Sequence, residues 1–564
     1  MSLETSTNEA SQPMDASEPF DRTTPSGLSV TSTKDEEESP DAGEHAIEKH
    51  NDEPTRPLDA DVEKQAIQDL PPSAPPPEKD PDLVEFDGPR DPGNPLNWPV
   101  RKRIAITLSM GMMTFVVTFV CQFYLPCHIR HLMLTHKKSS SVFATALGPV
   151  SAEFGIGETV ATLGVALFLL GFVLGPICFG PASEVYGRRV PLFSGYIVFA
   201  IFQIPVAVAQ NVETIMLCRF IGGFAASAPL AVVAGALADI WGPLDRAYAI
   251  CVFAASAFSG PVAGPIIGGF VTESYLGWRW TQWLTLIMAA LFGGIGLFII
   301  DETSAARILQ IRAKKLRFET KNWALHAKAD EKQITVRTIL TVYLIRPFVM
   351  LGQEPILACI TAYMSVLYGI LYLLFEAYPI EFHEIRGWSL GVSALPFCAF
   401  LVGIGGGTGL MAYSTATNFK RSFLKHGKAV PEERLPPMII CAIILPIALF
   451  WFAWTSEKHI SWVPSVIATG FLGGSLLVTF WQGINYLIDC YGFYSNSAIA
   501  VNTFIRSIAG AVFPLFASQM YRGLGVAWAT SILGFVCVAF IPAPILFYKY
   551  GARIRARSRF NPAG

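Results

Sequence analysis

The sequence is poor in charge and lacks the motifs of nucleotide, metal and disulfide chemistry. Only 15% of its 564 residues are charged, against about 25% in an average soluble protein, while 52% are hydrophobic and 40 are Phe. The ten cysteines show no Cys-x-x-Cys spacing, which argues against a disulfide framework or a zinc site. Because no Walker sequence, nucleophile elbow or dinucleotide fingerprint is present, we expect neither an ATP-driven pump nor an enzyme, and no cofactor or metal.

The charge that is present lies unevenly along the chain. Residues 1–100 hold 24 Asp and Glu against 7 Lys and Arg, whereas the rest of the chain holds 20 against 35. The first 95 residues are also rich in Pro and Ser and contain no apolar run. Such a composition cannot bury enough apolar surface to fold, so we predict a disordered acidic tail over residues 1–95 and no cleavable signal peptide.

Beyond the tail, apolar runs of about 20 residues recur, the length needed to cross a bilayer. Twelve such runs lie between residues 104 and 548, and a polar stretch divides them six and six, as in carriers built from two related halves around a central cavity. The sequence therefore predicts an all-α polytopic membrane protein with twelve transmembrane helices in two six-helix bundles. Its parts are the bundles 96–300 and 348–548, the central loop 301–347 and a basic tail 549–564.

Lysine and arginine indicate the orientation, because cytoplasmic loops retain them. With both termini inside, the cytoplasmic segments hold 26 Lys and Arg and the external loops only 4. The central loop contributes ten of them, and its residues 307–330 are predicted to form an amphipathic helix against anionic lipid headgroups. We expect a monomeric multi-pass protein of the plasma membrane, with both termini cytoplasmic and no nucleic-acid partner.

Residues 120–138 depart from this pattern. They place Pro126, Arg130 and further basic side chains where the first spanning helix should continue, and one central charge costs about 2.5–3.5 kcal/mol on insertion scales. Without them, residues 104–119 would join residues 139–147 in one uncharged run. We hypothesise that these 19 residues are a retained intron in the gene model. The alternative is a genuine insertion that forms an external loop or a re-entrant piece, and sequencing of the transcript distinguishes the two.

Three motifs combine small residues with charge in the first half of the chain. Between the second and third runs, glycines permit a tight turn, and an acid four residues before paired arginines allows a charge clamp. This motif consists of Gly180, Glu184, Gly187, Arg188 and Arg189. The fourth run contains Arg219 within an apolar span. In the fifth run, small residues let helices touch and prolines bend the helix. These are Gly260, Pro261, Gly264, Pro265, Gly268 and Gly269.

In this order, the three motifs resemble those of the major facilitator superfamily, and in particular its fungal twelve-span drug:proton antiporters. The stretches 91–98 (DPGNPLNW), 277–280 (GWRW) and 375–379 (FEAYP) are similar to the same family. The resemblance covers residues 91 to about 550 apart from 120–138.

The resemblance implies a role for each motif. The loop from Gly180 to Arg189 matches a lock of the outward-facing state, which Asp245 and Arg246 of the next cytoplasmic loop could complete. Arg219 matches an arginine linked with proton coupling. The motif in the fifth run is associated with antiporters rather than symporters, and it is the main reason to expect export. Glu184 stands where the family more often has Asp, and the charge is kept.

Proton coupling requires a titratable group that can face the cavity. Glu376 in the seventh run is the first candidate, since a carboxyl among aromatic side chains holds its proton more readily. A purely structural acid near the membrane surface is the alternative. Candidate cavity residues in runs seven, ten and eleven are Tyr368, Tyr372, Asn485, Tyr486, Asn496, Asn502 and Arg506. The aromatic ones, with Phe480 and Trp481, suit a planar apolar or cationic substrate, whereas Arg506 suits an acid or polar one. Each also fits a packing role.

The sequence thus predicts a proton-coupled antiporter that exports small organic molecules, such as drugs, toxins or secondary metabolites, by alternating access. Its partners would be a small-molecule substrate, protons and the lipid bilayer. A polyamine or nutrient carrier of the same superfamily is an alternative. A non-transporting membrane sensor is another, and a folded cytoplasmic module would favour it.

Overall fold

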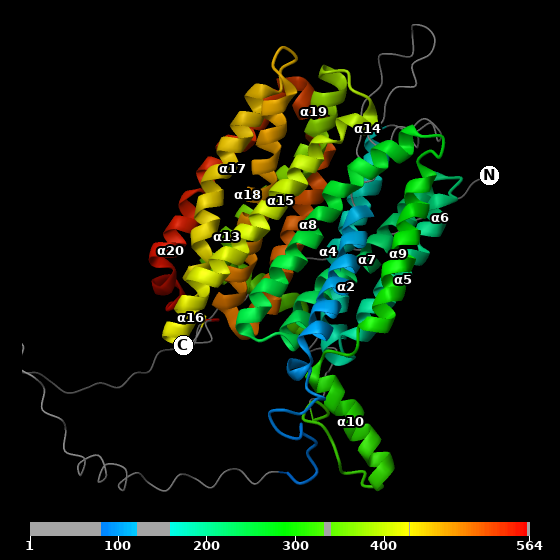
Figure 1. Ribbon diagram of the computed structural model, residues 1–564, viewed down its shortest axis with the longest axis vertical. Coiled ribbons are helices and arrows are strands. Elements are labelled where there is room, and N and C mark those ends of the chain that lie inside the picture. The colour runs from blue at the N-terminus through cyan, green and yellow to red at the C-terminus, as the bar shows by residue number, and fades with distance from the viewer. Residues whose placement is uncertain (1–79, 121–157, 332–339, 428, 561–564) are drawn as a thin grey trace, which may run out of the picture. The chain divides into compact units, whose positions relative to one another are not determined.

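The computed structural model describes residues 80–120, 158–331, 340–427 and 429–560 (Figure 1). In these residues, eleven helical segments are long and apolar enough to cross a membrane. The last segment has 61 residues, and as one helix it would be about 90 Å long, three times the thickness of a bilayer core. It is broken at Gly525, whose φ of 76° and ψ of 157° are not helical. The break divides this last segment into two membrane crossings. The eleven segments therefore provide twelve spans, and the prediction of twelve is confirmed.

The described residues of the first half contain six spans. Its helices are α2 (Val100–Phe119), α4 (Glu158–Val185), α5 (Arg189–Ile201) with its continuation α6 (Gln203–Ala207), α7 (Val212–Ile240), α8 (Pro243–Glu273) and α9 (Arg279–Ile299). With 20 residues, α2 is about 30 Å long and reaches the length of a span by itself. All of the anomalous segment except Val120 lies outside the described residues, as do residues 139–147, so the intron hypothesis stays a prediction.

The second half repeats the pattern with more irregular helix ends. It contains α12 (Arg346–Gln353), α13 (Pro355–Tyr378), the π-helical η4 (Pro379–Ile385), α14 (Leu390–Ser393), α15 (Pro396–Ser414), α16 (Lys420–His426), α17 (Leu435–Thr455), α18 (Trp462–Tyr491), α19 (Ser495–Phe540) and α20 (Pro542–Arg555). Prolines occupy the first or second position of α12, α13 and α15, where the missing N–H costs nothing. The seventh predicted run is divided at Glu354, between α12 and α13.

Glycines allow the helices to pack backbone to backbone. α4 packs against α7 and α2 against α8 in the first half, while α4 meets α19 and α8 meets α15 across the halves. A Cβ on Gly223 would lie 2.1 Å from the Phe168 carbonyl oxygen, and one on Gly403 would lie 1.8 Å from the Gly470 carbonyl oxygen. Only glycine permits such approaches, which supply the van der Waals contact that holds helices together in lipid.

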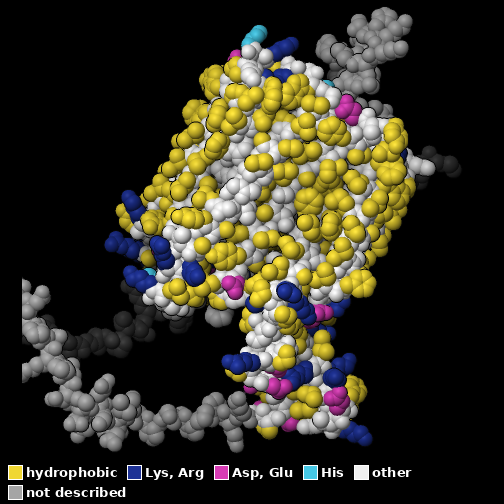
Figure 2. Space-filling model, viewed as in Figure 1, with side chains coloured by type: hydrophobic (Ala, Val, Ile, Leu, Met, Phe, Trp, Pro, Cys, Tyr) yellow, Lys and Arg dark blue, Asp and Glu magenta, His cyan; other side chains and the backbone are white. Residues whose placement is uncertain are grey.

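The two ends of the helices differ in charge. We call the end that carries α10 (Ala305–Thr320) and α16 the α10 face, and the opposite end, which carries α14, the α14 face (Figure 1). Figure 2 shows hydrophobic side chains over the helices between the two faces, with Lys and Arg gathered at the α10 face. This is the distribution of side chains that a membrane-spanning protein requires.

The segment before α2 docks on the central loop, so the boundary predicted at residue 95 falls inside a described segment. Leu83 forms a parallel bridge with His326, and Val84 is buried against Ala313 and Ala327. Asp91 accepts hydrogen bonds from the backbone N–H of Gly93 (2.7 Å) and from Arg312 Nη1 (2.7 Å). We call residues 80–98 together with 305–331 the docked module.

The helix of the central loop is shorter than residues 307–330. α10 ends at Thr320, because Lys321 adopts a left-handed conformation with φ 57° and turns the chain back toward its start. Part of its apolar side is covered by Val84. The sequence pattern shows that α10 is amphipathic, but it does not show that its partner is another part of the chain.

Candidate functional site: a cavity between the halves

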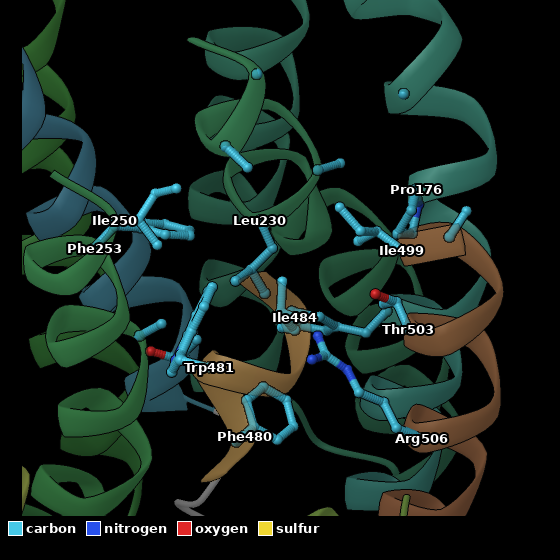
Figure 3. A pocket seen from close by; sticks show the side chains of 18 of the residues that line it. Pro176, Leu230, Ile250, Phe253, Phe480, Trp481, Ile484, Ile499, Thr503 and Arg506 are labelled. Atoms are coloured by element: carbon cyan, nitrogen blue, oxygen red, sulfur yellow. The ribbon is translucent and has the colours of Figure 1, made fainter. Parts of the chain in front are cut away.

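A cavity lies between the two halves. Helices α2, α4, α7 and α8 line it from one half, and α13, α18 and α19 from the other. Figure 3 shows side chains that project into it from several of these helices. Residues that Figure 3 labels include Pro176, Leu230, Phe253, Phe480, Trp481, Ile484, Ile499, Thr503 and Arg506. Its lining runs from Glu184 at the α10 face to Thr118 near the far end of α2, so the cavity extends through much of the depth of the bundle.

Contacts between the halves join two helices at the α14 face. Glu273 at the end of α8 accepts hydrogen bonds from the backbone N–H of Gly391 (2.9 Å) and from the Ser389 hydroxyl (3.3 Å). A Cβ on Gly269 would lie 3.3 Å from the Gly391 Cα. The last two glycines of the fifth-run motif, Gly268 and Gly269, are buried. The end of α8 and α14 are therefore joined at this face.

Aromatic side chains from both halves meet in the middle of the cavity. The rings of Phe258 and Phe480 lie 5.2 Å apart, and those of Phe253 and Trp481 lie 5.5 Å apart, both edge to face. Tyr368 stacks 6.1 Å from Phe480. Edge-to-face and offset contacts at these distances are favourable, so the aromatic cluster joins α8 to α18 and α13.

Arg506 of α19 is a cationic side chain within this cluster. Its guanidinium carbon lies 4.8 Å from the centre of the Phe480 ring and 5.4 Å from that of Tyr368. Figure 3 shows its nitrogen atoms directed into the cavity toward Ile484. Arg506 therefore places a permanent positive charge beside aromatic faces.

The charge motif at the α10 face forms a network with distant residues. Arg188 Nε lies 3.0 Å from Asp239 Oδ2, and Arg188 Nη1 donates to the Ser183 hydroxyl (2.9 Å). The backbone N–H groups of Arg188 and Arg189 donate to the Glu302 carboxylate at 2.8 and 3.2 Å. These bonds join the loop between α4 and α5 to the ends of α7 and α9.

Gly187 is required by the geometry of this network. Its φ is 87°, and an added Cβ would lie 2.4 Å from the Glu302 Oε2 atom. A side chain at this position would be both strained and in collision with the carboxylate. By contrast, nothing lies within 4 Å of a Cβ on Gly180, which lines the cavity.

Glu184 makes a contact that crosses between the halves at this face. Its Oε1 accepts a hydrogen bond from Asn496 Nδ2 at 2.8 Å. Both residues line the cavity. Asp245 is exposed in the first turn of α8, and within the described ranges no ion pair joins it or Arg246 to the network. Asp239 and Glu302 supply the acids instead, and the sequence reasoning did not place either of them in the network.

Arg219 is buried inside the first half rather than in the cavity. It is 2% exposed, its Nε donates to the Gly164 carbonyl (3.1 Å), and its guanidinium carbon lies 4.9 Å from the Phe168 ring. These contacts tie α7 to α4. Its assignment to proton coupling stays a prediction.

Glu376 is also outside the cavity lining. It is 1% exposed on α13, and neither of its carboxylate oxygens has a hydrogen-bond partner in the described part of the chain. A buried carboxylate without partners carries a large desolvation cost when it is charged, and it avoids that cost by taking up a proton. Glu376 therefore has the environment that a protonatable membrane carboxyl requires.

The structure divides the predicted cavity residues into two groups. Four of them line the cavity, namely Tyr368, Tyr372, Asn496 and Arg506. Three others are buried between helices outside the lining: Asn485 bonds Gln482, Tyr486 stacks on Phe547, and Asn502 donates to Thr361. Of the fifth-run motif, Pro261 lines the cavity, and Gly260, Gly264 and Pro265 are buried. The sequence reasoning missed Phe253 and Phe258, because aromatic residues in an apolar span look alike.

Comparisons with known proteins agree with the fold. A model of the Major Facilitator Superfamily matches residues 138–514. A citrinin biosynthesis cluster MFS transporter of Monascus ruber is 52% identical over 481 residues, which cover 85% of this chain and 92% of the relative. An ascochitine biosynthesis cluster MFS transporter of Didymella fabae is 48% identical, with 86% and 90% covered. The structure of the proton:xylose symporter XylE is similar with a TM-score of 0.56 at 15% identity, over 80% of this chain and 96% of that one.

Proposed function

Because the chain belongs to the major facilitator superfamily, we propose that it is a proton-coupled antiporter that exports small organic molecules across the plasma membrane. The observation that carries the proposal is the aromatic cavity between the halves, whose lining continues to the α10 face. Such a cavity can take up a small molecule from one side and, after the halves rock, release it on the other.

In this proposal, the α10 face and both termini lie in the cytoplasm, and the charge distribution supports this orientation. Lys and Arg gather there (Figure 2), as the positive-inside rule requires. In the described conformation, Glu273 and Gly391 join the halves at the α14 face, while Glu184 and Arg188 line the cavity at the α10 face. This is the arrangement from which an exporter would load.

The network around Arg188 would act as the lock between conformations. Arg188, Asp239 and Glu302 hold the α4–α5 loop to the rest of the first half, and Glu184 joins that loop to Asn496 of the second half. A hydrogen bond of this kind contributes only about 0.5–1.5 kcal/mol, so it is weak enough to break on each cycle. Asp245 and Arg246, which the sequence placed in a loop, lie in the first turn of α8 at the same face. They would act only through the surface charge around the network.

Proton coupling is assigned to Glu376, with Arg219 in support. Glu376 is buried on α13 with no hydrogen-bond partner among the described residues, and the same helix supplies Tyr368 and Tyr372 to the cavity. A change in its protonation would therefore alter the packing of a helix that lines the substrate site. The fifth-run motif at Gly260 to Gly269 brings α8 close to its neighbours and supports antiport, because the motif is associated with antiporters.

The relatives indicate the general class of cargo. Both fungal transporters described above are named for biosynthesis clusters of secondary metabolites. We propose that this chain likewise exports a secondary metabolite or a related toxin.

Export and coupling can be tested together in proteoliposomes. We would reconstitute the full chain, load radiolabelled 2-naphthoate on the side of the α10 face, and impose pH gradients of either sign. Transport that is driven by an opposing proton gradient and abolished by a protonophore supports antiport. Transport that is driven by protons moving in the same direction, or that ignores the gradient, would contradict it. Expression of the chain with and without residues 120–138 in an efflux-deficient yeast tests export in cells.

A further inference from the structure

Arg506 carries a charge that the cavity itself does not neutralise. Besides Arg506, the charged lining residues are Glu184 and Arg188. Arg188 pairs with Asp239, and Glu184 bonds Asn496. Asn496 and Arg506 lie ten residues apart on α19, which corresponds to about 15 Å along a helix. The carboxylate of Glu184 is therefore too far away to pair with Arg506.

The contacts that Arg506 does make compensate its charge only in part. Phe480 and Tyr368 present ring faces to it at 4.8 and 5.4 Å, and cation–π contacts favour the cation without accepting its hydrogen bonds. The Arg506 Nε atom is buried, and it has no hydrogen-bond acceptor among the described residues. A guanidinium has five N–H donors and usually meets an acceptor when it is removed from water.

A second donor of the same cavity lacks an acceptor. The indole Nε1 of Trp481, which lines the cavity on α18, is buried and has no partner within the described ranges. Phe253 packs on its ring. The middle of the cavity therefore offers unpaired donors and positive charge between aromatic faces, whereas its carboxylate stands at the α10 face.

From this arrangement we infer that the site takes planar aromatic anions, with a carboxylate or phenolate oxygen on Arg506 and the ring system among Phe258, Phe480 and Trp481. This inference rests on the proposed function, because it names the substrate class of the same cavity. A carboxylate binds a guanidinium through two parallel hydrogen bonds, and aromatic rings favour a flat partner. A cation would instead be repelled by Arg506 at short range. The sequence alone left open an apolar or cationic cargo for the aromatic residues and an acid or polar one for Arg506, and the position of Arg506 among the aromatic rings favours the acid.

The test compares three probes that share one ring system and differ in charge. They are 2-naphthoate, its neutral methyl ester and cationic 2-(aminomethyl)naphthalene, measured by scintillation proximity on the purified full chain with protein-free micelles as the blank. We expect 2-naphthoate to bind at least tenfold more tightly than the ester and the amine not to bind. Equal or tighter binding of the ester or the amine overturns the inference, and so does the absence of binding by all three.

Variants of Arg506 test whether this side chain is the source of the preference for the acid over the ester. Arg506→Gln should bind the acid and the ester with equal affinity, and Arg506→Lys should keep part of the difference in affinity. The control Lys458→Gln removes the same charge from an exposed loop and should leave both affinities unchanged. Preserved selectivity in Arg506→Gln overturns the assignment. If that variant does not fold, the probe series on the unaltered chain still decides the matter. Selective binding without transport in proteoliposomes would refute the exporter alone, and transport that prefers the amine would refute the anion site alone.

Discussion

Arg188 and Asp239, which are 51 residues apart in the chain, form an ion pair with 3.0 Å between Nε and Oδ2. The pair joins the residue that caps α5 to the last turn of α7. Their side chains are 17% and 24% exposed, so water screens the attraction only in part. The contact lies where the proposed lock must hold and release.

Exchange of the two charges tests the lock. Arg188→Asp and Asp239→Arg should each slow transport strongly, and the double variant should recover part of the activity because the pair is restored in reverse. We expect a coupling energy of about 1–2 kcal/mol in a double-mutant cycle on thermal stability. Asp245→Asn is the control and should change little. Additive losses without recovery would show that the pair does not act as a unit.

Glu376→Gln should abolish proton-driven transport and leave surface expression intact. The amide keeps the shape of a protonated carboxyl but cannot release a proton, so downhill exchange of labelled for unlabelled substrate should persist while accumulation against a gradient is lost. Both are measured in proteoliposomes with an imposed pH difference. Glu457→Gln, at an exposed acid outside the spans, is the control. Retained uphill transport would remove Glu376 from the mechanism.

Gly260→Ala should destabilise the protein, whereas Gly294→Ala should not. A Cβ on Gly260 would lie 2.1 Å from the Thr118 Oγ1 atom and 2.6 Å from the Phe115 carbonyl oxygen, and nothing lies within 4 Å of one on Gly294. Overpacking of this kind costs about 1–3 kcal/mol. Thermal unfolding in detergent measures the difference, and equal melting of the two variants would show that α8 can move away from α2.

The docked module should loosen in Asp91→Asn. Backbone N–H groups of Asp87 and Gly93, followed by Arg312, hold the pKa of Asp91 below its usual value. The charged Asp91 carboxylate therefore stabilises the folded module above about pH 4, the ordinary pKa of Asp. This stabilisation is lost as the pH falls through the pKa of Asp91 in the folded protein. Hydrogen exchange of residues 80–98 at pH 7 should therefore rise in the variant. Unchanged exchange would indicate that Val84 and its apolar contacts suffice.

His326 should give the same module a second pH dependence with the opposite sign. The Ala324 carbonyl, then the nearby Asp80 and Glu331 carboxylates, raise the pKa of His326 above its usual value of about 6.5. Protonated His326 stabilises the docked module fully below that pKa. This stabilisation is lost as the pH rises through the pKa of His326 in the folded protein. Exchange of residues 80–98, corrected for its intrinsic pH dependence, should thus be faster at pH 8 than at pH 6. His326→Gln should abolish that difference, and a difference that persists would exclude this side chain as its source.

Hydropathy and charge were sufficient to predict the architecture. Charge is excluded from membrane spans, and Lys and Arg are retained on the cytoplasmic side. The twelve apolar runs, their division by the central loop and the gathering of Lys and Arg on one side can therefore be recognised from the sequence. The motif at Gly180 to Arg189 was equally readable, because its residues are close in sequence. Its partners Asp239 and Glu302 were not, since they lie far away in the sequence and resemble ordinary acids at helix ends.

The faces of the spans were harder to predict than the spans themselves. A helix that is apolar all round gives no periodic signal for the side that faces a cavity. Asn496 and Asn502 illustrate this on one helix: the first lines the cavity, and the second bonds Thr361 inside the second half. Tyr486 and Asn485 on α18 likewise point away from the cavity that Phe480 and Trp481 line.

The docked module determines which part of the chain bears a force that is applied before residue 80. Residue 80 emerges beside α10, because Leu83, Val84 and Asp91 are fastened to the central loop. Lys102 at the start of α2 also lies 2.5 Å from Asp301 just after α9. A protein that pulled on the preceding segment would therefore load the joint between the halves before it loaded α2. The module would therefore transmit such a force to the central loop and shield α2 from it.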